Sequence, residues 1–240
     1  MPDIYLYDDV PVLKNKLGIK DSDLLDAVEA GMSRANMMLL YESGFQDFSP
    51  AGLCEIHRRL FSEVYEWAGK IRTINIEKRE RLLAGRSVWY SNDDNIPADL
   101  YSAFDKLLSQ PWGNFSREKF VFALARYFPP IWQVHPFREG NTRSIVMMMS
   151  LFVEHHGFYM DHELLAVSAG YVRDSFVMAC LGQYSEFEHL EKILLDAVCS
   201  DPVFYEETDD GPEAERSPRT EKRIKYQKEP YKPEPHYEKP

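Results

Sequence analysis

The chain has 240 residues, of which 44% are apolar, and its 39 acidic and 28 basic side chains give a formal net charge of −11. The apolar share is ordinary for a globular protein and excludes wholesale disorder, while only 12 glycines exclude a fibrous repeat. The acidic balance argues against nucleic-acid binding, because affinity for a phosphate backbone depends on clustered Lys and Arg.

Cysteine usage and hydropathy bear on the location of the protein. Cys54, Cys180 and Cys199 form no Cys-x-x-Cys pair, and the start MPDIYLYDDV lacks the basic-then-apolar layout of a signal peptide. The longest apolar run, Ile145–Val153, is interrupted only by Ser150 and is about half of the ~20 residues that a membrane-spanning helix needs. We therefore expect a reduced, cytoplasmic protein with no membrane partner and no nucleic-acid partner.

Two helices are predicted at the start of the chain. Apolar residues recur at helical spacing over residues 22–40. Ser49 followed by Pro50 is typical of an N-cap with proline at the first helical position, and the helix that follows is expected to continue to Gly69.

A different pattern follows these helices. Residues 72–76 alternate as a strand does, and residues 86–90 are the expected antiparallel partner, which predicts a small β-hairpin. Helical patterns then resume at residues 96–108, 117–127, 142–155, 162–181 and 187–198. The predicted fold class is all-α with one hairpin.

The composition changes near Ser200. Residues 201–240 contain 7 of the 15 prolines, 11 acidic residues and 8 basic residues. Such a segment buries too little apolar area to offset the cost of ordering it, so we expect a disordered or extended tail. A solvated tail without function is the simpler interpretation, and a regulatory segment is the alternative.

The segment His135–Arg143, with the sequence HPFREGNTR, carries the chemistry. Pro136 disfavours helix at His135, which predicts a loop, and Gly140 allows the tight turn that opens the next helix. The first N–H groups of a helix form an anion site, to which Arg143 adds a fork for phosphate oxygens. Glu139 suits Mg²⁺ shared with phosphates, and His135 suits a general base.

Each of these residues also has a simpler interpretation. A histidine before proline is usually a loop residue, Gly-Asn is usually a turn, and Arg143 fits an ordinary surface position. Their placement together within nine residues, directly before a helix that is apolar on nearly all sides, favours a functional site.

HPFREGNTR resembles the signature of the Fic family, His-Pro-Phe-x-(Asp/Glu)-Gly-Asn-Gly-Arg-x-x-Arg, whose members mostly transfer AMP from ATP to protein hydroxyls. The stretch FSPAGLCEIHRRLFSEVYEWAGKIRTINI resembles the family helix that leads into a hairpin flap, and KLGIKDSDLL resembles the usual start. The resemblance covers about residues 14–198. It implies a helical bundle with residues 1–50 as its N-terminal segment, 51–198 as its core and 201–240 as a tail.

The resemblance also implies roles for single residues. His135 would deprotonate the target Ser, Thr or Tyr hydroxyl, and Glu139 would hold Mg²⁺. ATP would be the substrate, with its phosphates on Arg138, Gly140, Asn141, Thr142 and Arg143. A flap at about residues 72–90 would pair with an extended segment of the target protein through Ser87, Val88, Trp89 and Tyr90. Tyr171 and Tyr184 would flank the adenine, although core packing accounts for them equally well.

Two positions depart from the family pattern. Thr142 replaces the usual glycine, which we expect to be tolerated because its main-chain N–H is kept. Val146 replaces the final arginine, which in the family grips the terminal phosphate. We therefore expect weaker ordering of ATP, and the nucleotide used stays open.

The sequence leaves alternatives open for how the protein is regulated and for which reaction it performs. Many Fic proteins are inhibited by a helix with (Ser/Thr)-x-x-x-Glu-(Gly/Asn), in the chain or on a small antitoxin. Ser217 and Glu221 have this spacing but precede Lys222, so chance is the favoured explanation over inhibition by the tail. A non-catalytic nucleotide-binding module and transfer of another nucleotide or phosphate group are the alternatives to adenylyl transfer.

Overall fold

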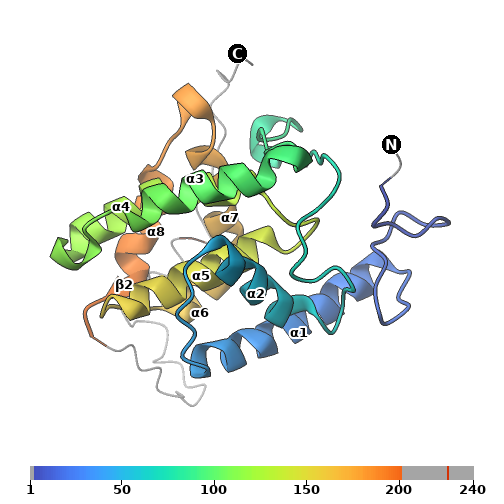
Figure 1. Cartoon of the computed structure of the whole chain (residues 1–240), viewed down its shortest axis with the longest axis horizontal. Helices are drawn as coiled ribbons and strands as arrows, with labels where there is room; N and C mark the ends of the chain where they lie inside the picture. Colours follow the sequence, from blue (N-terminus) through green and yellow to red (C-terminus); the bar gives the residue numbers. More distant parts are fainter. Residues whose placement is uncertain (1–2, 202–225, 227–240) are drawn as a thin grey trace, which may run out of the picture. The chain divides into compact units, whose positions relative to one another are not determined.

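The computed structural model describes residues 3–201 and Tyr226 (Figure 1). These residues form α1 (Ser22–Glu42), α2 (Pro50–Phe61), α3 (Ile96–Leu108), α4 (Arg117–Val134), α5 (Asn141–His155), α6 (His162–Val167), α7 (Ala169–Ala179) and α8 (Glu188–Ala197). Four short 3₁₀ turns are η1 (Arg81–Leu83), η2 (Asp93–Asn95), η3 (Trp112–Asn114) and η4 (Gly182–Tyr184). The predicted all-α class is confirmed. The predicted disorder of the tail and its Ser217/Glu221 pair fall outside the described residues.

The described chain divides into two units, each assembled from separate segments. The first unit comprises Met1–Ile76, Tyr90–Leu108 and Val134–Phe152, and the second comprises Glu77–Trp89, Ser109–Gln133 and Val153–Pro240. The first unit therefore contains α1, α2, α3 and most of α5. The division into segments 1–50, 51–198 and 201–240 stays a prediction.

Helices α1 and α2 pack against each other in the first unit (Figure 1). Asp21 caps α1 by accepting a hydrogen bond from the Leu24 N–H, and Ser49 caps α2 through the Gly52 N–H at 3.1 Å. Helix α2 is preceded by its predicted cap but ends at Phe61, earlier than the expected Gly69. Val64 and Tyr65 are buried in the turns that follow, so their apolar spacing imitated a longer helix.

The strands predicted at residues 72–76 and 86–90 are not formed. The Arg72 side chain bonds the carbonyls of Ile74 and Ser91, and the Ser87 hydroxyl accepts from the Lys78 N–H at 3.1 Å. Side chains thus take main-chain groups that a ladder would have used. The sheet of the described residues instead pairs β1 (Tyr159–Met160) with β2 (Val198–Cys199), antiparallel, in the second unit.

In the second unit α4 runs past its predicted end at Tyr127, through Pro129 and Pro130. Proline inside a helix removes a main-chain hydrogen bond and usually ends the helix. Here the Cys180 thiol donates to the Pro129 carbonyl at 3.3 Å, and Trp132 beyond the prolines is fully buried against Phe176. Burial of the face of α4 that contains Trp132 outweighs the preference of proline to end a helix.

The segment expected as one helix over residues 162–181 is divided at Ser168 into α6 and α7. Asp161 caps α6 through the Leu164 N–H at 2.8 Å. Within the described part of the chain, no helix has the length and hydropathy to cross a membrane.

Candidate active site

The loop between α4 and α5 begins at His135, and α5 begins at Asn141. His135 is therefore in a loop, as predicted, and Thr142 is accommodated in the first turn of the helix. His135 has the left-handed backbone angle φ 52° and is 2% exposed. A residue other than glycine adopts this conformation at a cost, so its surroundings must hold it there.

Two residues of the first unit, Arg72 and Asn141, hold the main chain of this loop. Arg72 Nε donates to the His135 carbonyl at 2.9 Å, and the Arg72 N–H donates to the Pro136 carbonyl at 2.8 Å. The Asn141 amide accepts from the Phe137 N–H at 2.9 Å and donates to the Phe137 carbonyl at 2.8 Å. Asn141 is buried and its side chain fixes the loop, while its contact with phosphate stays a prediction.

Gly140 makes the closest approach in the loop. Its φ is +81°, and a Cβ atom there would lie 2.5 and 2.6 Å from two ring carbons of Phe61. Only glycine fits this backbone against α2. The start of α5 is thereby seated on the Phe61 ring.

His57 of α2 is a part of the site that the sequence analysis did not find. Its Nδ1 accepts from the Gly69 N–H at 2.8 Å, and its Nε2 lies 3.0 Å from the Glu139 carbonyl. Because a carbonyl only accepts, Nε2 carries the hydrogen and the ring is neutral. The ring stacks on the fully buried Phe137 at a centroid distance of 3.8 Å, so His57 supports the loop from α2.

Burial lowers the pKa of His57 from 6.5 to about 4, and the charge of Arg143 adds to this effect. The unfolded chain therefore binds a proton at His57 between pH 6.5 and 4 that the folded chain does not bind. Stability should fall as the pH falls through this window, by about 2 kcal/mol at pH 5. Urea unfolding of the parent protein and of His57→Gln at pH 7 and pH 5 measures this loss.

The parent protein should lose about 2 kcal/mol more than His57→Gln between these two pH values, because both proteins share every other titrating group. Equal losses in the two proteins would show that the His57 ring is protonated in the folded state.

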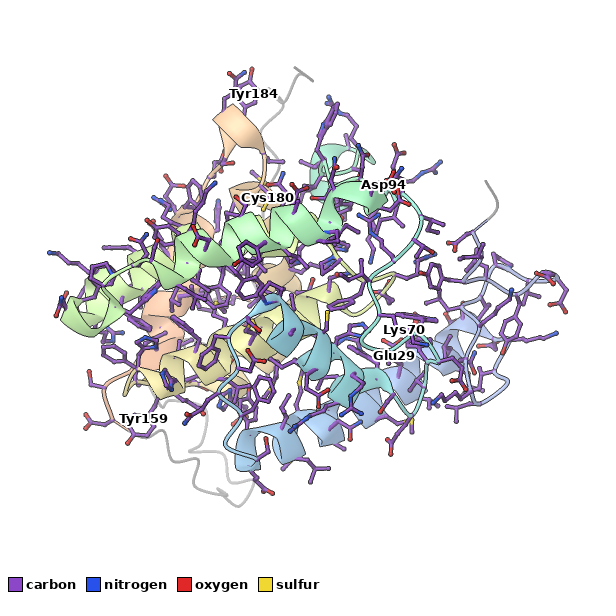
Figure 2. All side chains as sticks on the ribbon, in the orientation of Figure 1. Glu29, Lys70, Asp94, Tyr159, Cys180 and Tyr184 are labelled. Atoms are coloured by element: carbon purple, nitrogen blue, oxygen red, sulfur yellow. The ribbon has the colours of Figure 1, made fainter. Side chains whose placement is uncertain are left out.

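Arg143, one turn into α5, is held from α1. One guanidinium nitrogen donates to the Glu29 carboxylate, and the other donates to Ser33 Oγ at 3.0 Å. The guanidinium also lies over the Phe61 ring at 4.7 Å. Glu29 lies on α1 (Figure 2), is 4% exposed and also accepts a hydrogen bond from the Tyr65 hydroxyl. Burial, followed by the Glu29 charge, raises the pKa of Tyr65.

The remaining polar residues of the segment have different settings. The Glu139 carboxylate accepts from the Gly140 N–H at 3.1 Å, directly before α5. Arg138, predicted to bind phosphate, forms an ion pair with Asp3 in which its Nε lies 2.8 Å from the carboxylate. Val146 follows Arg143 by one turn, at the position of the missing family arginine.

Tyr90 belongs to the first unit and contacts the predicted base. Its ring stacks on the His135 imidazole, with a centroid distance of 4.0 Å and an angle of 28° between the planes. Tyr90 thus lies against the predicted base, and its part in docking the target stays a prediction.

The other predicted residues of the flap belong to the second unit. Val88 is buried, whereas the Trp89 side chain is 64% exposed, which is the alternation of an extended segment. Gln133 Nε2 donates to the Trp89 carbonyl at 3.1 Å. The segment is tied to α7 by Glu80, whose carboxylate accepts two hydrogen bonds from Arg173, at 2.7 and 2.8 Å.

The two predicted adenine contacts occupy different elements of the second unit. Tyr171 of α7 lies beside His189, with its hydroxyl 3.3 Å from Nδ1, and its ring contacts the Tyr226 ring at 4.8 Å. Tyr184 points outward from η4 (Figure 2) and is 43% exposed. Their part in binding adenine stays a prediction.

The first unit thus brings together a buried histidine, a carboxylate, a helix N-terminus and an arginine. The first N–H groups of a helix lie outside its internal ladder and, with the helix dipole, favour anions. Arg143 reinforces this preference. The arrangement can bind a phosphate group beside a residue that accepts a proton.

Residues 47–153 match the family model described as Fic/DOC family. Among curated proteins, the chain is 29% identical over 161 residues to "Probable protein adenylyltransferase y4lH" of Sinorhizobium fredii, covering 66% of this chain and 79% of that one. It is also 29% identical over 200 residues to a protein adenylyltransferase of Bartonella henselae, covering 79% of this chain but 36% of the relative.

The fold has solved counterparts. The BepC protein of Bartonella tribocorum, solved with bound AMPPNP, superposes with a TM-score of 0.70 at 23% identity, over 82% of this chain and 97% of that one. The family match, the curated relatives and this fold agree with one another. The chain described here therefore contains, at residues 47–153, a domain of the Fic/DOC family.

Proposed function

We propose that the chain is a protein adenylyltransferase, which transfers AMP from ATP to a Ser, Thr or Tyr hydroxyl of a target protein. The observation that carries this proposal is the loop His135–Gly140, which holds a buried histidine directly before the anion-binding start of α5. The curated relatives named as adenylyltransferases support the same nucleotidyltransferase chemistry. The BepC structure contains an ATP analogue, which supports ATP as the substrate here.

In this mechanism the residues of the loop divide the work. His135 accepts the proton of the target hydroxyl while the hydroxyl oxygen forms a bond to the α-phosphorus of ATP. The bond from that phosphorus to the oxygen bridging to the β-phosphate breaks, and pyrophosphate leaves. The start of α5 and Arg143 stabilise the charge on the phosphates, and a base placed in this way contributes on the order of 10²–10⁴ in rate.

Magnesium fits the site through Glu139. Among the described residues no cluster of three or more His, Cys, Asp or Glu side chains could enclose a metal. Mg²⁺ commonly needs only one or two carboxylates when substrate phosphates supply further oxygen ligands, and Glu139 lies at the helix start where phosphates would bind. When bound, the ion would neutralise phosphate charge.

The phosphate ligands in this proposal are the main-chain N–H groups of Asn141 and Thr142 and the side chain of Arg143. The Gly140 N–H would have to exchange its bond to the Glu139 carboxylate to join them. Glu29 and Ser33 each accept one hydrogen bond from the Arg143 guanidinium, which has five N–H groups in all. Arg138 would have to exchange its ion pair with Asp3 to join them.

We propose that the target docks on the main chain of residues 87–90 as an added extended strand. The exposed Trp89 next to the buried Val88 supports this placement, because alternate burial leaves one face of the segment toward a partner. The cytoplasm stays the proposed location, on the basis of three cysteines that are free thiols. An inhibitory antitoxin is tested by co-purification from native cells, and inhibition by the tail is tested by truncation at Ser200.

The function is tested by mass. The chain is incubated with Mg²⁺ and separately with ATP, UTP and GTP, in the presence of a lysate of its native cells, and intact masses are measured. We expect a gain of one AMP on this protein or on a partner with ATP. Gain with another nucleotide would change the substrate, and no gain with any would leave a nucleotide-binding module, which the presence of His135, Glu139 and Arg143 disfavours.

Restoring the family arginine should tighten ATP binding. Val146 lies one turn after Arg143 on α5, so Val146→Arg places a second guanidinium on the same face. A bond to a charged group contributes about 1.5–3 kcal/mol, which predicts at least a several-fold lower Kd for ATP by calorimetry. Val146→Met, of similar length without charge, is the control, and an equal Kd in both variants would contradict the expectation.

A further inference from the structure

Arg72 is one of the largest fully buried side chains of the protein and is 1% exposed. In the sequence, Arg72 is only the first residue of a predicted strand. It lies in the first unit, as do all the groups that its side chain bonds.

The bonds of Arg72 all go to main-chain carbonyls. Nε donates to His135 at 2.9 Å, and the two terminal nitrogens donate to Ile74 and Ser91. Burial lowers the pKa of Arg72, and the charge of Asp93 opposes this effect. Burying a guanidinium costs several kcal/mol, which an apolar side chain of the same volume would avoid. The directional bonds are what an apolar residue could not supply.

These bonds bear on the direction of the His135 ring. His135 has the left-handed φ of 52°, a conformation that costs about 1–3 kcal/mol and persists only where the surroundings fix it. Arg72 holds the His135 carbonyl through its side chain and the next carbonyl, of Pro136, through its N–H at 2.8 Å. The two peptide groups that follow the His135 Cα are thereby fixed, which restrains the orientation of the His135 residue from its C-terminal side.

The same guanidinium also fixes the partner of the ring. Ser91 follows Tyr90, whose ring stacks on the imidazole at 4.0 Å. Ile74 and Ser91 belong to the stretches through which the chain leaves the first unit at residue 76 and returns to it at residue 90. The Arg72 side chain therefore holds Ile74 and Ser91 close to the loop that carries His135, all within the first unit.

We propose that Arg72 is a positioning residue for His135, which fixes the direction of the imidazole by holding the main chain on both sides of the His135–Tyr90 stack. The proposal rests on the proposed function of His135 as the base. Arg72 itself touches neither nucleotide nor hydroxyl in this scheme, and it should affect the rate of transfer more than the binding of ATP.

The test compares Arg72→Lys and Arg72→Met with Arg117→Met in the full chain. Arg117 makes the same kind of bonds in the second unit, to the carbonyls of Val198 at 2.8 Å and Leu195, so its loss controls for lost stability. We expect kcat for AMP transfer to fall about 10–100-fold in both Arg72 variants, as misplacement of a reacting group by about 1 Å does. The Kd for ATP should stay within about two-fold, and Arg117→Met should keep the parent kcat.

A second readout does not depend on activity. The Tyr90 ring current should shift the Hε1 resonance of His135 upfield, and that resonance is assigned by its loss in His135→Gln. In Arg72→Lys we expect this upfield shift to disappear while the other histidine resonances stay in place. Lysine keeps the charge, but its donors all lie on one nitrogen and cannot match three carbonyls that are bonded by three separate nitrogens of the guanidinium.

Folded Arg72 variants with the parent kcat and the parent His135 resonance would overturn the proposal, as would a raised Kd for ATP with unchanged kcat. If Arg72→Met does not fold, Arg72→Lys decides by the same two readouts. Absence of AMP transfer in the parent protein would overturn the proposed function, and the resonance alone would then decide whether Arg72 positions His135.

Discussion

Replacement of His135 by alanine should abolish measurable transfer of AMP while leaving the fold and nucleotide binding in place. A positioned base contributes about 10²–10⁴ in rate, and the remaining proton acceptor of the loop, the Glu139 carboxylate, is assigned to Mg²⁺ in the proposed function. The groups assigned to the phosphates lie after it, at the start of α5, and keep their supports in α1 and α2. The measurement is transfer of labelled AMP together with the Kd for ATP.

His155→Ala is the matched control, since His155 is the last residue of α5, the helix that follows the loop. It should retain transfer within about two-fold. A His135→Ala protein that labels its target at a near-normal rate would remove His135 from the role of base, whatever the behaviour of the control.

The Gly140→Ala substitution should cost roughly 2–5 kcal/mol of stability and weaken ATP binding. The cost has two parts, of which the first is the left-handed backbone, at about 1–2 kcal/mol. The second is overpacking, at about 1–3 kcal/mol, because the new Cβ would lie 2.5 Å from a Phe61 ring carbon. Relief of this clash would move the start of α5, where the phosphates are proposed to bind. Urea unfolding and calorimetry with ATP measure both effects.

Gly157 offers a control for the backbone alone. Its φ is +83°, close to that of Gly140, but a Cβ atom there meets nothing within 4 Å. Gly157→Ala should therefore cost only the first part and keep ATP binding. The double variant Gly140→Ala with Phe61→Leu should recover part of the lost affinity, and equal losses in the two single alanine variants would show that Phe61 does not constrain the loop.

Local patterns predicted most of the helices because caps and apolar spacing act over a few residues. Ser49 and Pro50 mark a helix start that the structure confirms, α1 begins at the predicted residue 22, and residues 96–108 form a helix with the predicted bounds. The strands at 72–76 and 86–90 were wrong because the side chains of Arg72 and Ser87 take main-chain groups that a ladder would use. Such competition between side chain and main chain has no signature in an alternating pattern.

The site was predicted only as far as one continuous segment reaches. His135, Glu139 and Arg143 are close in sequence, so their joint placement could be recognised. His57, Arg72 and Glu29 support that segment from 82, 63 and 114 residues away along the chain. A buried histidine on a helix is ordinarily core packing, and a single sequence contains no signal that pairs Glu29 with Arg143. These partners are visible only once the chain is folded.

The Glu29–Arg143 pair sets a limit on when this site can exist during synthesis. The two residues are 114 positions apart, so a ribosome adding about 5–20 residues per second completes Glu29 roughly 6–23 s before Arg143. Throughout that interval the Glu29 carboxylate lacks the guanidinium that donates to it in the finished unit. A nascent chain that ends before His135 carries neither the base nor the anion site. The residues of the proposed activity are therefore synthesised late, after the helices α1 and α2 that support them.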